Sequence, residues 1–290
     1  MVAKPGRNGE RIIVKMNKTS IEWCDSTWNP VTGCNNGCKY CYARRIAQRF
    51  SYDGMTLDAP AELQRVWIED TKRNGGGCGN HVLRYPVDLL DDGRKVPYPF
   101  GFEPTLHRYK LVEPQQRKKP QTIFVCSMAD LFGAWVPNEW IEAVFEACEQ
   151  APQHRYLFLT KNPQRYGELA KAGKLPKRGN MWYGSTLDSM NARRYSGRFT
   201  DNTFVSIEPL TEKMDVGLGS FGRDRFVIIG AETGNRKGKV VPKKEWVDII
   251  CEAADLTHAA VFMKDSLLPI MGEANMRREL PWEDSNEHYD

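Results

Sequence analysis

From residue 121 onward, the chain alternates short apolar runs with longer stretches of helical periodicity. The runs are four to six residues long, which is typical of strands buried on both faces of a parallel sheet. They are Thr122–Cys126, Arg155–Thr160, Met181–Gly184, Thr203–Ile207, Phe226–Ile229 and Ala260–Met263. Amphipathic stretches such as Asn138–Gln150 and Lys243–Ala254 lie between them. Because strands that alternate with helices form right-handed βαβ units, the pattern predicts an α/β fold, a barrel or partial barrel.

The first part of the chain has less periodicity. Residues 1–18 are polar and basic, and we expect a flexible leader there. A first barrel strand is predicted near Asn29–Gly33, and apolar residues at helical spacing predict a helix over Tyr42–Phe50. Residues 51–120, with three consecutive glycines and several prolines, are expected to form an irregular insertion. The predicted organisation is therefore a leader (1–18), one barrel domain (19–270) and an acidic C-terminal tail (271–290).

Composition and charge narrow the class of protein. The 41 basic and 37 acidic residues give a net charge of +4, too small to indicate a nucleic-acid-binding protein by itself. No apolar run is long enough for a membrane-spanning helix, and residues 1–15 have no apolar core of a secretory signal. Eight cysteines in a chain of this length are best explained as reduced thiols. We therefore expect a cytoplasmic protein without a membrane segment.

Polar side chains follow almost every predicted strand. In α/β barrels the chemistry takes place at the carboxyl ends of the strands. The residues at these ends are Ser127, Asp130, Thr160, Lys161, Ser185, Thr186, Ser206, Glu208, Glu232, Lys264 and Asp265. Each alone has a structural explanation as a helix cap or a surface charge, and Glu232 is equally explained as an acid at a helix N-terminus. Together they predict a polar cavity.

Three of the cysteines are clustered in the sequence Cys34-Asn-Asn-Gly-Cys38-Lys-Tyr-Cys41, a C-x3-C-x2-C spacing. A structural zinc site needs four protein ligands, so zinc would require a fourth thiolate such as Cys24 or Cys78. Three thiolates on one loop suit a 4Fe-4S cluster with one iron left open. Gly33 and Gly37 would allow this loop to wrap closely around a cluster. The spacing favours the cluster and leaves zinc as the alternative.

The motif, with Tyr40 before the last cysteine and a predicted helix after it, resembles the radical S-adenosylmethionine (SAM) superfamily. Further blocks resemble, within it, a phage-associated three-cysteine-motif family that is usually described as a domain of unknown function. These blocks are Ser20–Cys34, Phe102–His107, Ser127–Phe132, Leu159–Pro163, Ser206–Leu210 and Gly230–Gly234. The resemblance runs from about residue 19 to 265. It departs from the family at Cys24, where threonine is common, at 67–98, which look inserted, and at Arg236–Val240.

This resemblance implies a partial (β/α)6-type barrel in which Cys34, Cys38 and Cys41 ligate the cluster. The open iron would bind the amino and carboxylate groups of SAM, and reductive cleavage would give a 5′-deoxyadenosyl radical that abstracts hydrogen from a substrate. The resemblance also implies a reductant such as flavodoxin or ferredoxin, and in some genomes a separately encoded partner protein. Strand order assigns SAM contacts to Ser127, Asp130, Ser185, Glu208, Gly230, Glu232 and Lys264, with Lys161 as a further candidate for the carboxylate or an anionic substrate.

Two other functions compete with this interpretation. One is a non-enzymatic nucleic-acid-binding module in which zinc or an iron-sulfur cluster stabilises the fold. The other is a barrel enzyme of acid–base chemistry that uses Glu208, Glu232 and Lys264. The substrate is not identified by the sequence. The phage association and basic stretches around 108–119 and 155–178 suggest a nucleic acid or a nucleotide, although the first stretch is equally explained as a solvated loop, and peptide or small-metabolite substrates stay open.

Overall fold

The computed structural model describes residues 17–51, 68–74, 78–87, 95–195, 202–217 and 219–283. This part of the chain divides into two compact units. The first unit extends to His154, apart from Ser20–Asp25, which belong to the second unit with the residues from Arg155 onward.

The first unit contains a short parallel ladder. β1 (Asn17–Lys18) pairs antiparallel with β2 (Ser26–Trp28), and β2 pairs parallel with β7 (Thr122–Val125). The side chains of β2 and β7 are buried throughout, as predicted for β7. The first barrel strand, predicted near Asn29–Gly33, is instead β2, which ends at Trp28, while Val31–Thr32 within the predicted range pair in a second sheet. Pro30 has no N–H to donate to a ladder, and the Asn29 side chain instead accepts a hydrogen bond from the Met128 N–H at 2.9 Å.

A second, smaller sheet occupies part of the segment that we expected to be irregular. Its order is β3-β6-β5-β4. The strands are β3 (Val31–Thr32), β4 (Ile68–Asn74), β5 (Cys78–Leu83) and β6 (Thr105–His107). This sheet could not be predicted from hydrophobic periodicity. The sequence of β4 is Ile-Glu-Asp-Thr-Lys-Arg-Asn, with one apolar residue, and β3 and β6 are too short to show an alternation of apolar and polar residues.

Two helices of the first unit, those at Tyr42–Arg49 and Asn138–Glu149, lie where their periodicity predicts them, and two short 3-10 helices lie in the segment expected to be irregular. They are α1 (Tyr42–Arg49), η1 (Arg108–Lys110), η2 (Pro114–Gln116) and α3 (Asn138–Glu149). α1 ends one residue before the prediction, because Phe50 caps it by donating its N–H to the Ile46 carbonyl. α3 buries one apolar face that includes Trp140, Val144 and Phe145.

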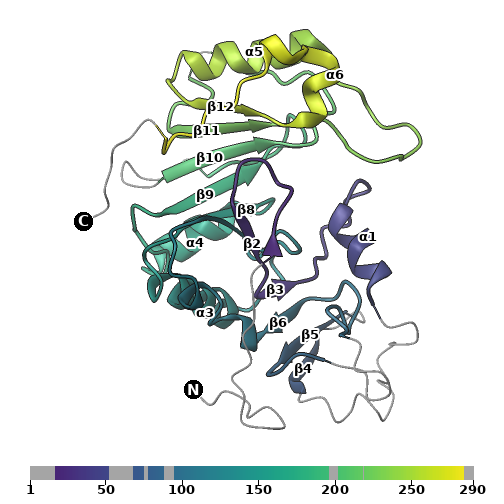
Figure 1. Ribbon diagram of the computed structural model, residues 1–290, viewed down its shortest axis with the longest axis vertical. Helices are drawn as coiled ribbons and strands as arrows, with labels where there is room; N and C mark the ends of the chain where they lie inside the picture. Colours follow the sequence, from purple (N-terminus) through teal and green to yellow (C-terminus); the bar gives the residue numbers. More distant parts are fainter. Residues whose placement is uncertain are drawn as a thin grey trace. The chain divides into compact units, whose positions relative to one another are not determined.

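The second unit is a parallel sheet in chain order (Figure 1). Its strands are β8 (Arg155–Thr160), β9 (Met181–Thr186), β10 (Asn202–Ile207), β11 (Asp224–Ile229) and β12 (Ala260–Met263). Its helices are α4 (Gln164–Lys171), α5 (Lys244–Asp255), η3 (Asp265–Leu267), α6 (Leu268–Met271) and η4 (Glu273–Asn275). All five predicted strands are confirmed, each within two residues of its expected bounds.

The apolar core of the second unit explains why its strands have continuous apolar sequences. Side chains from β10, β11 and β12, among them Val205, Val227 and Val261, are fully buried against Val247 and Ile250 of α5. Strands that bury both faces need continuous apolar runs, which is the pattern the sequence shows. With seven parallel strands in chain order and helices α1, α3, α4 and α5 in the connections between some of them, the fold is α/β of the partial (β/α)6-barrel type, as predicted.

Residues after α6 continue to pack against the edge strand β12. The Met263 N–H donates to the Arg277 carbonyl at 2.9 Å, and the Glu279 N–H donates to the Val261 carbonyl at 3.0 Å. Further on, Trp282 makes edge contacts with Trp182 and Phe226, with ring centroids 5.5 and 5.4 Å away. The described part of the expected tail thus covers an edge that would otherwise present unpaired backbone groups. Within the described residues, no helix is long and apolar enough to cross a membrane.

Candidate functional site

The cysteine loop begins at Gly33, directly after β3. Gly33 has a φ of +85°, and a Cβ at this position would lie 2.1 Å from the carbonyl oxygen of Glu103. Its N–H donates to the Met128 carbonyl at 3.0 Å, and the Cys34 N–H donates to the Phe102 carbonyl at 3.2 Å. Only glycine fits this crowded left-handed position, so the loop leaves β3 in a fixed direction.

The loop ends on a helix. Cys41 is the N-cap of α1, and its sulfur accepts a hydrogen bond from the Arg44 N–H at 3.3 Å. At the other end of the loop, the Asn36 N–H donates to the Cys34 sulfur at 3.5 Å. Backbone N–H groups thus donate to the sulfurs at both ends of the loop and hold both side chains in position.

The three cysteine sulfurs of the loop lie near one another. Burial raises the pKa of Cys34 to about 12, with smaller contributions from the charges of Asp130, Cys38 and Cys41. The three sulfurs are thus close enough to interact electrostatically. Three cysteine side chains on one loop are the donor set of a 4Fe-4S cluster with one open iron, so the chemistry of these ligands fits the cluster.

Arg44 holds the cysteine loop from the side of the helix. Its guanidinium donates to the Cys34 carbonyl at 3.1 Å and lies 4.8 Å from the centre of the Phe102 ring. Behind the loop, the Nε2 atom of His81 lies 2.6 Å from a carboxylate oxygen of Glu103. The His81 ring stacks on Phe100 at 3.7 Å. These residues support the cysteine loop. They could not be identified from the sequence, because their contacts join distant parts of the chain.

The structure brings Ser127 and Asp130 next to the cysteine loop, as strand order predicts. Asp130 is 5% exposed, and its carboxylate accepts a hydrogen bond from the Asn36 side chain at 3.0 Å. The Ser127 carbonyl accepts a hydrogen bond from the Tyr42 hydroxyl at 2.8 Å. The two residues follow β7, whose chain turns at Cys126 with a φ of +60°. One buried carboxylate therefore lies beside the candidate cluster ligands, and Asn36 is a site residue that the sequence pattern did not single out.

The remaining predicted residues lie at the carboxyl ends of strands in the second unit. Glu208 after β10 and Lys264 after β12 form an ion pair. Gly230 lies between them, since a Cβ there would be 3.1 Å from the Lys264 side chain and 3.3 Å from that of Glu208. Ser185 is buried at the end of β9, where its hydroxyl accepts from the Tyr195 N–H at 2.9 Å.

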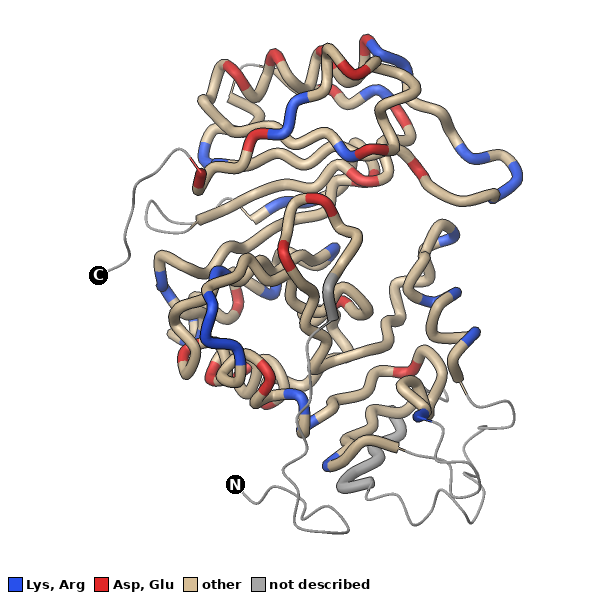
Figure 2. The backbone as a smooth tube through the Cα atoms, in the orientation of Figure 1, with Lys and Arg blue, Asp and Glu red and all other residues tan. Residues whose placement is uncertain are grey.

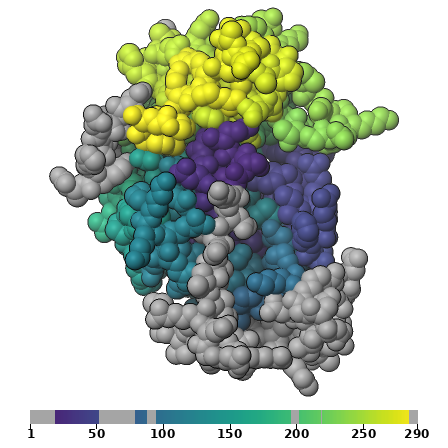
Figure 3. All heavy atoms as spheres, in the orientation of Figure 1, coloured from purple at the N-terminus to yellow at the C-terminus, as the bar shows by residue number. Residues whose placement is uncertain are grey.

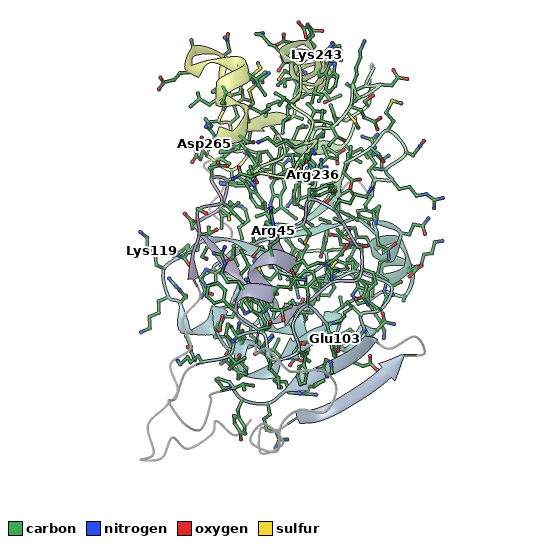
Figure 4. All side chains as sticks on the ribbon, turned by 90° about the vertical axis from the view of Figure 1, so that its right-hand side faces the viewer. Arg45, Glu103, Lys119, Arg236, Lys243 and Asp265 are labelled. Carbon is green, nitrogen blue, oxygen red and sulfur yellow. The ribbon has the colours of Figure 1, made fainter. Side chains whose placement is uncertain are left out.

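Glu232 has a partner that its sequence context did not reveal. It is 7% exposed and bonds both carboxylate oxygens to the Arg236 guanidinium, at 2.5 and 2.7 Å. The next helix, α5, begins at Lys244, so the alternative of an acid at a helix N-terminus is wrong. Arg236 lies in the stretch that departs from the family pattern, and Figure 4 labels it. Lys161 likewise pairs with Asp188 at 2.5 Å.

Of the two alternative zinc ligands, Cys24 and Cys78, the structure describes the side chain of Cys24. The Cys24 sulfur lies 3.8 Å from the Ile21 carbonyl, its own neighbour in sequence. The side chain of Cys78 lies outside the described residues. The cysteines whose side chains are described form no disulfide.

Comparisons with known proteins place the chain in a family. No curated protein matches it. Similar solved structures include spore photoproduct lyase in complex with a dinucleoside spore photoproduct, at 11% identity and a TM-score of 0.49, covering 88% of this chain and 81% of that one. A cysteine-to-alanine variant with the same ligand has 10% identity and a TM-score of 0.48, covering 88% and 80%. Residues 18–267 match the family described as "Protein of unknown function (DUF5131)", and the chain belongs to that family.

Proposed function

We propose that this protein is a radical SAM enzyme whose 4Fe-4S cluster is ligated by Cys34, Cys38 and Cys41. The observation that carries the proposal is the cysteine loop itself. It offers three cysteine ligands close enough to interact electrostatically, on an α/β fold with parallel strands in chain order. When bound, the reduced cluster would supply the electron that cleaves the S–C5′ bond of SAM and yields a 5′-deoxyadenosyl radical.

The described side chains suggest how the protein would bind SAM. In our proposal the Asp130 carboxylate accepts a hydrogen bond from the SAM ammonium, since it is buried and already oriented by Asn36. Ser127 would assist it. Ser185 and Glu208 would accept hydrogen bonds from the ribose hydroxyls. The backbone from Gly230 to Glu232 would contact the adenine of SAM. The ammonium group of Lys264 would balance the charge of the SAM carboxylate.

We also propose a nucleic acid or a nucleotide as the substrate. The first unit presents the exposed basic residues Arg108, Lys118 and Lys119, which suit contacts to phosphate. The resemblance to a phage-associated family favours the same class of substrate.

The proposal is tested by anaerobic reconstitution with iron and sulfide, followed by dithionite and SAM. We expect 5′-deoxyadenosine by chromatography, and we expect it to fall below detection in Cys34→Ala, Cys38→Ala and Cys41→Ala. Cys24→Ala is the matched control, because Cys24 is also partly exposed but lies outside the motif. A protein that binds one zinc and never cleaves SAM would instead be the metal-stabilised module.

The substrate class is tested by following deuterium into 5′-deoxyadenosine. Deuterated nucleotides or oligonucleotides are added to the reaction, and the mass of the 5′-deoxyadenosine formed is measured by mass spectrometry. Transfer of deuterium into the product supports the class, while transfer from a peptide or metabolite pool alone contradicts it.

A further inference from the structure

Helix α1 carries an apolar stripe that faces solvent. Tyr42, Ile46 and Phe50 are 44%, 38% and 53% exposed. They are spaced four residues apart, so they lie on one side of the helix, while Ala43 and Ala47 face the protein interior. Seven large apolar side chains are exposed in the described part of the chain, and three of them are on or next to this helix. Figure 3 shows the residues of α1, in blue, at the surface.

The same side of the helix is strongly basic. Arg45 and Arg49 are exposed and flank the apolar stripe, and Lys39 precedes it in the cysteine loop. No acidic residue occurs between Asp25 and Asp53. Figure 2 shows the blue segments of α1 without a red neighbour on the helix, and Figure 4 labels Arg45 on it. We call Tyr42, Arg45, Ile46, Arg49 and Phe50 the α1 face.

The α1 face lies next to the candidate cluster. Cys41 caps the helix, and Ile46 is five residues further on, which corresponds to a rise of about 7.5 Å. Electron transfer between proteins needs a short path from the protein surface to the electron acceptor. About one and a half turns of α1 separate this surface from Cys41.

We propose that the α1 face is the docking site for a small acidic electron-carrier protein of the flavodoxin or ferredoxin class. This inference rests on the proposed function. The carrier would lose one electron and become oxidised, and the cluster held by Cys34, Cys38 and Cys41 would gain it and become reduced. A small apolar centre with a cationic rim fits the modest, charge-steered interfaces of electron-transfer partners.

Other occupants fit the face less well. A second copy of this chain would bring Arg45 and Arg49 against the same arginines, with no acid on the helix to neutralise them. Single-stranded nucleic acid would use flat rings in succession for stacking, and the centre of this stripe is Ile46. The charge and the apolar centre together favour an acidic protein.

The test measures binding and electron transfer separately. The probe is a bacterial flavodoxin with an acidic surface, titrated in its oxidised form against the cluster-free chain by calorimetry. We expect weak binding that declines with salt, weakened about tenfold or more by the Arg45→Glu/Arg49→Glu variant and several-fold by Ile46→Ser. The control variant Lys213→Glu/Lys243→Glu makes the same charge change on exposed residues of the second unit that have no proposed binding role, and we expect its affinity to match wild type.

The second readout is the rate of cluster reduction. Flavodoxin hydroquinone should reduce the face variants about tenfold or more slowly than wild type, whereas dithionite should reduce all of them equally. Circular dichroism confirms that each variant is folded. Equal flavodoxin affinity in face and control variants overturns the docking site, as does a single-stranded oligonucleotide that binds the α1 face in place of flavodoxin. A chain that assembles no cluster contradicts the proposed function instead.

Discussion

At the scale of single residues, two glycines of the cysteine loop have different tasks. Gly33 has a positive φ and faces the Glu103 carbonyl, whereas Gly37 has a φ of +68° with no atom within 4 Å of a Cβ. Glycine is therefore required at position 33 by both the backbone conformation and the close packing, and at position 37 by the backbone conformation alone.

Replacement of these glycines separates the two effects. Gly33→Ala should lower the free energy of unfolding by about 2–4 kcal/mol, because a steric clash adds to the cost of a left-handed alanine. It should also lower the iron bound per chain after reconstitution. Gly37→Ala is the control and should cost about 1 kcal/mol, with iron content near wild type. Equal effects of the two substitutions would contradict the packing argument. Urea unfolding and iron analysis measure both.

Glu113 is a buried acid outside the candidate site. It is 4% exposed, and burial raises its pKa to about 7, although Lys110 and Arg117 act in the opposite direction. The folded protein therefore holds this proton more tightly than the unfolded chain does. Stability from this group is complete below the unfolded pKa and is lost as pH rises through the folded pKa.

Urea unfolding between pH 5 and pH 8 tests this dependence. The free energy of unfolding of wild type should fall over this range relative to Glu113→Gln, by up to about 3 kcal/mol. The amide does not ionise, so the variant should lack this contribution. If the difference between the two proteins stays constant with pH, Glu113 is ionised in the folded state and this account of it is wrong.

At the scale of elements, the segment after α6 stabilises the second unit through Trp282. The Arg155 guanidinium lies 4.7 Å from the Trp282 ring, whose edges also meet Trp182 and Phe226. These residues lie in strands β8, β9 and β11, so one side chain contacts three strands of the sheet.

Loss of Trp282 should therefore weaken the whole element. Trp282→Ala should reduce the free energy of unfolding by about 2–4 kcal/mol, through lost aromatic contact and burial. Val241→Ala, at a side chain that is 64% exposed, serves as the control and should stay within about 0.5 kcal/mol of wild type. Denaturant unfolding followed by tryptophan fluorescence measures both, and a Trp282→Ala protein as stable as the control would contradict the role of the segment.

At the scale of the whole molecule, the strands that could be predicted from the sequence are those buried on both faces. The strands from β7 onward are buried on both faces, so their apolar runs were visible. The sheet of β3 to β6 was not, since β4 is mostly polar and its partners are two to six residues long. Strand formation there depends on pairing between distant segments, which leaves no local period.

The candidate site was predictable to a similar extent. The cysteines form a local motif, and Asp130, which strand order made a candidate, is hydrogen-bonded to Asn36 of their loop. The partners of the charged residues were not predictable, because Glu208 and Lys264 are 56 residues apart and meet only in the folded sheet. The support of the loop by His81 and Glu103 is hidden for the same reason.

The central claim is that the cysteine loop holds a 4Fe-4S cluster with one open iron. The most direct test is iron analysis with electron paramagnetic resonance of the anaerobically reconstituted, dithionite-reduced chain, before and after SAM is added. We predict about four irons per chain and a spectrum that changes with SAM, because SAM would bind the open iron. Both should be lost in Cys38→Ala and kept in Cys24→Ala. A chain that binds one zinc, or a cluster whose spectrum SAM leaves unchanged, would contradict the account.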